Sequence, residues 1–154
     1  MRKIRRKNRR GAAVLEMAII LGIFLVTTMG MLDLGVGVYR YHLIAQAARF
    51  GARRAIVHGE MASQLGSWGP ATIDVAATAS EEPIVDGAED GIQPMLIGCD
   101  LSQSRIRVEW LDGSNGFEDR VRVTVTSPYT PLFLFILSNT TINLTASSTM
   151  RIAH

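Results

Sequence analysis

The sequence predicts an α+β fold in which one long N-terminal helix, transmembrane in its first half, packs on a small antiparallel β-sheet. Three observations carry this prediction. Residues 12–32 form a long apolar run, alanines recur at helical intervals in residues 45–55, and the last third of the chain alternates polar and apolar residues. A chain of 154 residues has the length of one domain.

Charge is distributed unevenly along the chain. The whole sequence has a formal charge of +2 and a pI near 9.0, with 47% apolar and 19% charged residues. Seven of its 16 basic residues precede residue 11. The rest of the chain contains the other nine basic residues and all 14 acidic residues, so its net charge is −5. Because nucleic-acid binding needs a basic surface against the phosphates, we expect no nucleic-acid partner. The seven early basic residues are Arg2, Lys3, Arg5, Arg6, Lys7, Arg9 and Arg10.

Residues 12–32 are predicted to cross a membrane as a helix. Their 21 positions contain one charge, Glu16, and the helix would be about 31 Å long, which matches the hydrocarbon core of a bilayer. A secretory signal peptide has a shorter apolar region, about 7–15 residues, followed by a small-residue cleavage site. The preceding basic cluster keeps the N-terminus in the cytoplasm, so residues from about 35 onward are expected outside. An ordinary signal anchor shares all these features.

Glu16 is the residue that an ordinary anchor leaves unexplained. An ionisable side chain within a spanning segment is costly and rare, which makes it a candidate functional residue. Glu16 lies about 7 Å from the boundary of the segment, so its side chain could also reach the interface and be tolerated without a role. Composition alone leaves both interpretations open.

The run RRGAAVLE, from Arg9 to Glu16, resembles the class III prepilin processing site. That site has a basic leader, a Gly, and an apolar stretch with Glu fifth after the cut. The resemblance implies that a prepilin peptidase cleaves between Gly11 and Ala12 and leaves the helix in the membrane. The new α-amine at Ala12 would lie one helical turn, about 6 Å, from Glu16. A neighbouring helix displaced by that distance could pair its amine with the Glu16 carboxylate.

The stretch that follows the span, residues 33–57, resembles TadE-like pseudopilins of tight-adherence (Flp, type IVc) pilus systems. The apolar Met17 stands where that family usually has Phe. A looser similarity covers residues 120–152, where Ser147–Arg151 ends the last strand. The matching positions in the first stretch are Asp33, Gly35, Tyr39, Tyr41, Gln46, Ala47, Ala48, Arg49, Gly51, Ala52 and Arg53.

This resemblance implies a pilin-like α+β fold and a minor pseudopilin that assembles or primes a Flp-type pilus. Its implied partners are other pilins, the prepilin peptidase, the assembly platform of the bacterial inner membrane, and membrane lipid. The alternative is an uncleaved single-pass accessory protein that presents an extracytoplasmic binding module. The expected parts are a leader over residues 1–11, a membrane helix over 12–34, its extracytoplasmic continuation over 35–58, and an α+β domain over 59–154.

The continuation of the helix has two different faces. Ala45, Ala48, Ala52 and Ala55 recur at intervals of three and four residues, so a sheet or a second helix could approach them closely. Arg49 and Arg53 share another face, either as a solvated pair or as a contact for pseudopilins or lipid headgroups. Asp33 marks the outer end of the span, where capping or water contact is its simplest role. A bend or local melting is predicted near residues 30–37, because Gly30, Gly35 and Gly37 weaken the helix there.

The middle of the chain is predicted to be irregular. Gly and Pro residues crowd residues 58–74, and residues 73–79 fit a short helix or a short strand equally well. Residues 80–91 carry five acidic side chains around Pro83 and two glycines, which favours a solvated loop. A calcium site is the lesser alternative, because the spacing of an EF-hand is missing.

The final third is predicted to form the sheet. Residues 105–110 and 120–125 alternate in polarity, and the turn-forming segment 112–116 between them predicts a hairpin. Its apolar face should pack on the helix, while four arginines share the outer face with Glu109. Residues 131–137, an apolar run too short for a spanning helix, fit a buried strand, a membrane-touching loop or a partner surface. Residues 141–152 should form the last strand.

No pattern in the sequence predicts an enzyme. His42, His58 and His154 have no metal-ligand spacing, and no nucleophile arrangement or phosphate-binding glycine loop is present. We therefore expect no catalytic residue, no metal and no cofactor. Cys99 is the single cysteine, so an intrachain disulfide is impossible, and a small buried apolar role is favoured over an intermolecular bridge.

Overall fold

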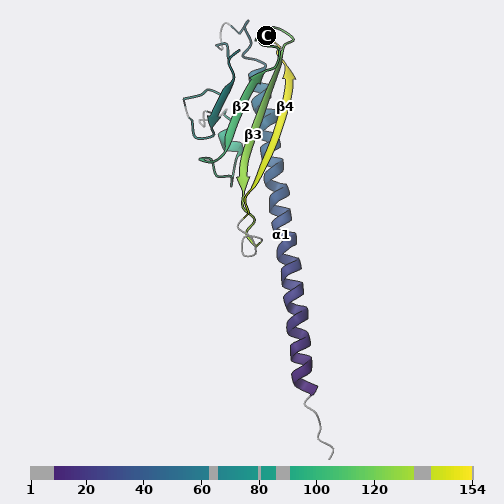
Figure 1. Cartoon of the computed structure of the whole chain (residues 1–154). Coiled ribbons are helices and arrows are strands. Elements are labelled where there is room, and N and C mark those ends of the chain that lie inside the picture. Colours follow the sequence, from purple (N-terminus) through teal and green to yellow (C-terminus); the bar gives the residue numbers. More distant parts are fainter. Residues whose placement is uncertain (1–8, 63–65, 80, 86–90, 134–139, 154) are drawn as a thin grey trace, which may run out of the picture.

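A helix of 47 residues, α1 (Arg9–Ala55), runs the whole length of the structure, and the sheet covers only its C-terminal half (Figure 1). The computed structural model describes residues 9–62, 66–79, 81–85, 91–133 and 140–153. The leader residues 1–8, three of the five acidic side chains in residues 80–91, His154 and residues 134–137 of the apolar run lie outside this described part. One long apolar helix followed by an antiparallel sheet confirms the predicted α+β arrangement.

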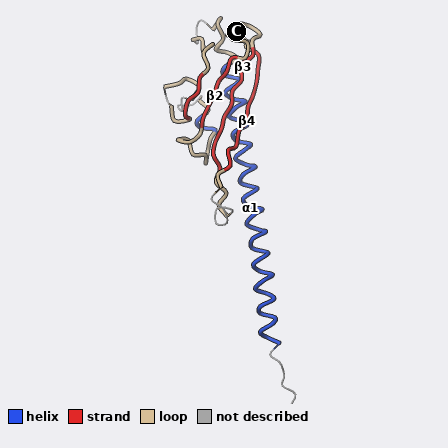
Figure 2. The backbone as a smooth tube through the Cα atoms, in the orientation of Figure 1, coloured by secondary structure: helices blue, strands red, loops and turns tan. Residues whose placement is uncertain are grey.

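The sheet has four strands in the order β1-β2-β3-β4, and every neighbouring pair is antiparallel. Figure 2 shows these strands on one side of the upper half of the helix. The strands are β1 (Ile73–Ala76), β2 (Arg105–Trp110), β3 (Arg120–Tyr129) and β4 (Ile142–Arg151), with a short 3-10 helix, η1 (Gln93–Met95), before β2. The predicted hairpin and the last strand are confirmed, and the undecided segment 73–79 begins as a strand.

The predicted alanine face of α1 packs against the sheet. Ala48, Ala52 and Ala55 are completely buried, and Ala45 is partly buried, while Arg49 and Arg53 are exposed. The sheet contributes the inward side chains of β2 and β3, which alternate as their sequence predicted because successive residues of a strand point to opposite faces. These side chains are Ile106, Val108, Trp110, Val121, Val123 and Val125.

The acidic segment after residue 80 is not only a solvated loop. Ile84 and Val85 are fully buried, together with Ile92 and Leu96 near η1, and all four belong to the hydrophobic core. The sequence did not predict the burial of Ile84 and Val85. Acidic residues dominate the composition of this segment, and two consecutive apolar residues do not form the repeating pattern of a helix or a strand. Cys99 is a free thiol that packs, partly buried, against the same core, as the small apolar role predicted.

The predicted weak point of the helix is absent from the described residues. Helical structure continues through Gly30, Gly35 and Gly37, so the expectation of a bend or local melting there is wrong. Gly37 has a packing role instead, because a Cβ at this position would lie 3.2 Å from the ring of Tyr129. The helix is therefore continuous although each glycine destabilises it by about 1 kcal/mol relative to alanine.

Charged side chains on the outer face of the sheet form pairs. Arg107 contacts Glu109 at 2.8 Å, and Arg105 lies 3.7 Å from Asp74 of β1. Arg120 makes a two-pronged contact with Asp112 in the β2–β3 turn, with N–O distances of 2.6 and 3.1 Å. The expected row of arginines on the outer face is confirmed. Asp74 and Asp112, as well as the expected Glu109, form ion pairs with these arginines.

Asp112 should make the stability of the protein vary with pH in the acidic range. The hydrogen bonds from the side chain and backbone of Arg120 lower the pKa of Asp112 from its ordinary 3.8 to about 2. Because the folded pKa is depressed, the contribution is present above pH 3.8 and is lost as the pH falls toward about 2. We expect Asp112→Asn to melt below the parent at pH 7 and the gap to close by pH 2. A constant gap across this range, measured by thermal melting in detergent, would contradict the assignment.

Candidate functional site

The first half of α1 touches nothing else in the described chain. Every residue from 11 to 27 is exposed, and its large apolar side chains are about half to two-thirds exposed. Within the described residues this is the one helix long and apolar enough to cross a membrane, and none of its most apolar window is buried. Thr27 and Thr28 donate their hydroxyl protons to the carbonyls one turn earlier, Ile23 and Phe24, so neither hydroxyl needs water. A bare apolar helix of this length requires lipid or other helices around it.

Gly11, Ala12 and Glu16 lie together in the first turns of this bare segment. Ala12 and Glu16 are four residues apart, so they share one face of the helix. Glu16 is exposed, as any group that pairs with another chain must be. Arg49 and Arg53, in contrast, lie more than about 50 Å farther along the helix axis. The predicted assembly residues therefore form two separate groups, with Asp33 between them.

Asp33 joins the helix to the hairpin formed by β3 and β4. Its side chain is only 6% exposed, and its two carboxylate oxygens accept the backbone N–H groups of Leu132 and Phe133 at 3.0 and 2.8 Å. The hydroxyl of Tyr129 donates to the backbone carbonyl of Asp33 at 2.9 Å. The expected contact with water is therefore wrong, because residues 99 and 100 positions later in the chain bind this carboxylate.

Tyr129 completes the junction from the side of the sheet. Its ring is buried over Gly37, and the guanidinium of Arg40 lies 5.1 Å from the ring centroid, in the range of a cation–π contact. Burial, followed by the nearby charge of Asp33, raises the pKa of the Tyr129 hydroxyl, so it stays protonated and able to donate. Sequence reasoning missed Tyr129, and its place at the end of a β-rich segment gave no sign of a partner on the helix.

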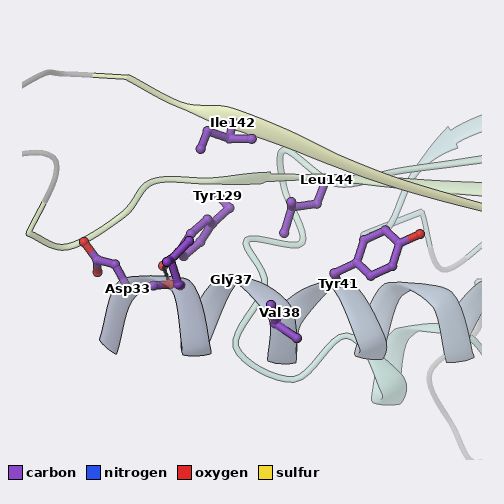
Figure 3. A pocket seen from close by; sticks show the side chains of 8 residues that line it. Asp33, Gly37, Val38, Tyr41, Tyr129, Ile142 and Leu144 are labelled. Carbon is purple, nitrogen blue, oxygen red and sulfur yellow. Dashed lines mark hydrogen bonds between the residues drawn. The ribbon is translucent and has the colours of Figure 1, made fainter. Parts of the chain in front are cut away.

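A shallow apolar groove of about 270 Å³ begins at this junction (Figure 3). Figure 3 shows Asp33, Gly37 and Tyr41 on the helix opposite Tyr129, Ile142 and Leu144 on β3 and β4, and Val38 also lines the groove. Leu34, Val38 and Tyr41 are exposed apart from this contact. The groove thus continues the apolar surface of the bare helix onto the sheet.

A second cluster of buried polar groups lies at the far end of the sheet. Asn115 accepts the indole N–H of Trp110 at 2.9 Å, and its amide donates to the carbonyls of His58 and Trp68 and to the hydroxyl of Ser67. The His58 ring stacks on Trp68 with centroids 4.0 Å apart. These contacts fix the irregular segment after α1 rather than form a reactive site. In the described part of the chain, no three His, Cys, Asp or Glu residues are placed to hold a metal.

Comparison with known families identifies the helix. Residues 11–53 match the family described as TadE-like protein. The N-terminal helix of this chain is therefore similar to that of TadE-like proteins. The match covers the bare half of α1, Asp33, and most of the packed half, whereas the looser similarity at residues 120–152 lies beyond it. No curated protein and no solved structure matches the chain.

The match describes the helix and not the sheet domain, because residues 11–53 make up less than a third of the chain. Within the described residues, the one long apolar helix fits a single membrane crossing.

Removing the Asp33 carboxylate should release the hairpin from the helix. Asp33→Ala leaves two backbone N–H groups without their acceptors, which costs about 1–3 kcal/mol for each buried group that water does not reach. We expect faster hydrogen exchange at Leu132 and Phe133 in this variant and an intermediate rate in Asp33→Asn, which keeps one acceptor oxygen. The control is Glu81→Ala, which removes an exposed acidic side chain. Unchanged exchange in Asp33→Ala would show that the two hydrogen bonds do not hold the hairpin.

Proposed function

We propose that this protein is a minor pseudopilin that acts in the assembly or priming of a Flp-type (tight-adherence) pilus. The observation that carries the proposal is the TadE-like helix, of which one half is bare and apolar and the other half carries a folded domain. A helix built in this way can pack beside other pilin helices in a membrane while the domain stays outside it.

Processing and lateral pairing would involve the first turns of the helix. A prepilin peptidase would cleave after Gly11 and expose the α-amine of Ala12. In a packed bundle, the amine of one subunit would lie against the Glu16 carboxylate of a neighbour shifted by about 6 Å along the axis. Such a pair favours one axial offset, because a charge left unpaired in a low-dielectric environment is costly.

The orientation follows from the basic leader and the positive-inside rule. The N-terminus would face the cytoplasm of a bacterial cell, residues 12–34 would cross the inner membrane, and residues 59–154 would lie outside it. An assembly platform in that membrane would then extract the subunit. Arg49 and Arg53, exposed on the outer half of the helix, would meet neighbouring pilins or lipid headgroups, whereas Asp33 acts indirectly by positioning the hairpin.

Mass spectrometry of the mature N-terminus tests the proposal. The full chain is expressed with and without a co-expressed prepilin peptidase, and the expected product begins at Ala12 only when the peptidase is present. A Gly11→Val variant is the control, because a side chain at this position should block cleavage without disturbing the helix, where a Cβ meets no atom within 4 Å. An intact leader in the presence of active peptidase would favour the uncleaved accessory protein.

Glu16 separates processing from assembly. We expect Glu16→Ala to be cleaved after Gly11 as efficiently as the parent but to lose pilus assembly, because the carboxylate that selects the axial offset is gone. Glu16→Gln, which keeps the shape and removes the charge, should share this loss. Normal piliation in a cleaved Glu16→Ala strain, counted by electron microscopy, would exclude the pairing role.

A further inference from the structure

We infer that Leu132 and Phe133, at the start of the β3–β4 connection and called here the hairpin tip, form a second membrane contact in the outer leaflet beside the spanning helix. The inference depends on residues 12–32 crossing the bilayer, and it does not depend on processing or on a role in the pilus.

The depth of the tip is set by Asp33. The backbone N–H groups of Leu132 and Phe133 lie within 3.0 Å of the Asp33 carboxylate, and Asp33 directly follows the last residue of the apolar run. A helix that begins to cross at Ala12 reaches the outer boundary of the hydrocarbon core after about 31 Å, which is the level of Leu32 and Asp33. The hairpin tip is therefore held at the depth where hydrocarbon gives way to headgroups.

The tip is apolar and open at this depth. The side chain of Leu132 is 69% exposed, although its neighbours Tyr129 and Pro131 are buried. Around the helix at the same level, Met31, Leu32 and Leu34 are also exposed. Leu34 also lines the apolar groove above this level, so exposed apolar side chains of the helix and of the hairpin lie at a similar depth, where water would solvate them poorly.

The charged residues of the hairpin lie at the end away from the membrane, and none lies toward the tip. Residues 123–150 contain no Asp, Glu, Lys or Arg, so the last seven residues of β3, about 23 Å of strand, carry no charge toward the tip. At the opposite end of the hairpin, Arg120 faces Arg151 across the two strands. The helix places its first cation after Asp33 at Arg40, about 10 Å higher, where a guanidinium would meet lipid headgroups.

Depth and charge favour lipid over a protein partner at Leu132 and Phe133, which lie at the level of the membrane boundary in a stretch without charged residues. A stable protein interface buries about 800 Å² on each side. A bilayer contact needs far less area, because the spanning helix already anchors the domain and the tip only fixes its tilt. The hairpin would thereby hold the domain against the membrane surface.

Site-directed fluorescence in lipid nanodiscs tests the inference. The full chain carries Cys99→Ser and one of three reporter substitutions, Leu132→Cys, Phe117→Cys or Leu21→Cys, each labelled with bimane in phosphatidylethanolamine–phosphatidylglycerol discs. Phe117 is the matched control, because it is a comparably exposed apolar side chain (61%) in the β2–β3 loop at the far end of the sheet. Leu21 reports on the span itself. Circular dichroism checks that each labelled protein is folded.

We expect lipids with a nitroxide near the headgroup to quench the probe at Leu132 several-fold more than the probe at Phe117. Lipids with a nitroxide deep in the acyl chain should do the same for the probe at Leu21, which lies near the centre of the span. Aqueous iodide should quench the probe at Phe117 most. Iodide quenching at Leu132 equal to that at Phe117 would place the tip in water and overturn the inference. Protection from both quenchers would indicate a protein contact and overturn it as well. Loss of lipid quenching at Leu21 would refute the membrane span along with it.

Discussion

Replacing Asn115 with alanine should lower the free energy of unfolding by about 3 kcal/mol or more, because several buried polar groups would lose their partner together. Asn115 is 5% exposed and joins the β2–β3 turn to the segment after α1. Without its amide, the indole N–H of Trp110 loses its acceptor, and the carbonyls of His58 and Trp68 lose a donor. Alanine supplies no polar group in place of the amide.

Two further variants separate this network from a general loss of side-chain bulk. Asn115→Asp keeps an acceptor for Trp110 but turns a second oxygen toward carbonyl oxygens, so it should be as damaging as alanine near neutral pH. Asn143→Ala removes an exposed asparagine from β4, and we expect a change within about 0.5 kcal/mol. Chemical unfolding in detergent, followed by tryptophan fluorescence, measures all three. An Asn115→Ala protein as stable as Asn143→Ala would contradict the account of the network.

Gly69→Ala should cost about 3 kcal/mol, through the backbone and through packing at once. Gly69 has φ +83°, a left-handed conformation that costs an L-residue about 1–2 kcal/mol. An added Cβ would also overlap the ring of Trp110, with 2.7 Å to Cδ2. Trp110 is buried and held by Asn115, so it cannot swing away cheaply, and forced overpacking adds about 1–3 kcal/mol.

Gly66→Ala is the matched control for this prediction. Gly66 has nearly the same backbone conformation, with φ +79°, but a Cβ there meets no atom within 4 Å. Its substitution should show only the backbone cost, about 1–2 kcal/mol. The difference between the two variants in the midpoint of thermal unfolding then reports the contact with Trp110. Equal midpoints would mean that Trp110 yields to the added methyl group.

The packed elements that the sequence determined are those in which burial repeats at a regular interval. The alanine face of α1 and the alternation in residues 105–110 and 120–125 became what their periods predicted. The bare run of residues 12–32 became a helix that was predicted from its length and its apolar composition instead. A helix or strand with one buried face must repeat its apolar residues at 3.6 or 2 positions, so the pattern records the packing. The resemblance of this helix to TadE-like proteins depended instead on particular residues between Gly11 and Arg53.

Gly11, Ala12 and Glu16 stay predictions, because the partners that would act on them are other chains. The family match begins at Gly11 and includes Glu16, but cleavage and pairing need a peptidase and a second subunit. The geometry adds that Glu16 is exposed beside Ala12 in the bare half of the helix.

Only the tertiary structure decided what Asp33, Tyr129 and Asn115 do. Asp33 is held by residues about 100 positions away, and Asn115 by segments 47 and 57 positions away. It also brought Ile84 and Val85 into the core from an acidic segment and kept α1 helical through Gly37. Most of these contacts join single residues that are far apart in the chain. Such a contact needs only one residue on each side, so it leaves no repeating pattern in the sequence. A repeating pattern of buried residues can be recognised within one short segment of the sequence. The junction between the helix and the β3–β4 hairpin involves distant residues, so it exists only once the chain has folded.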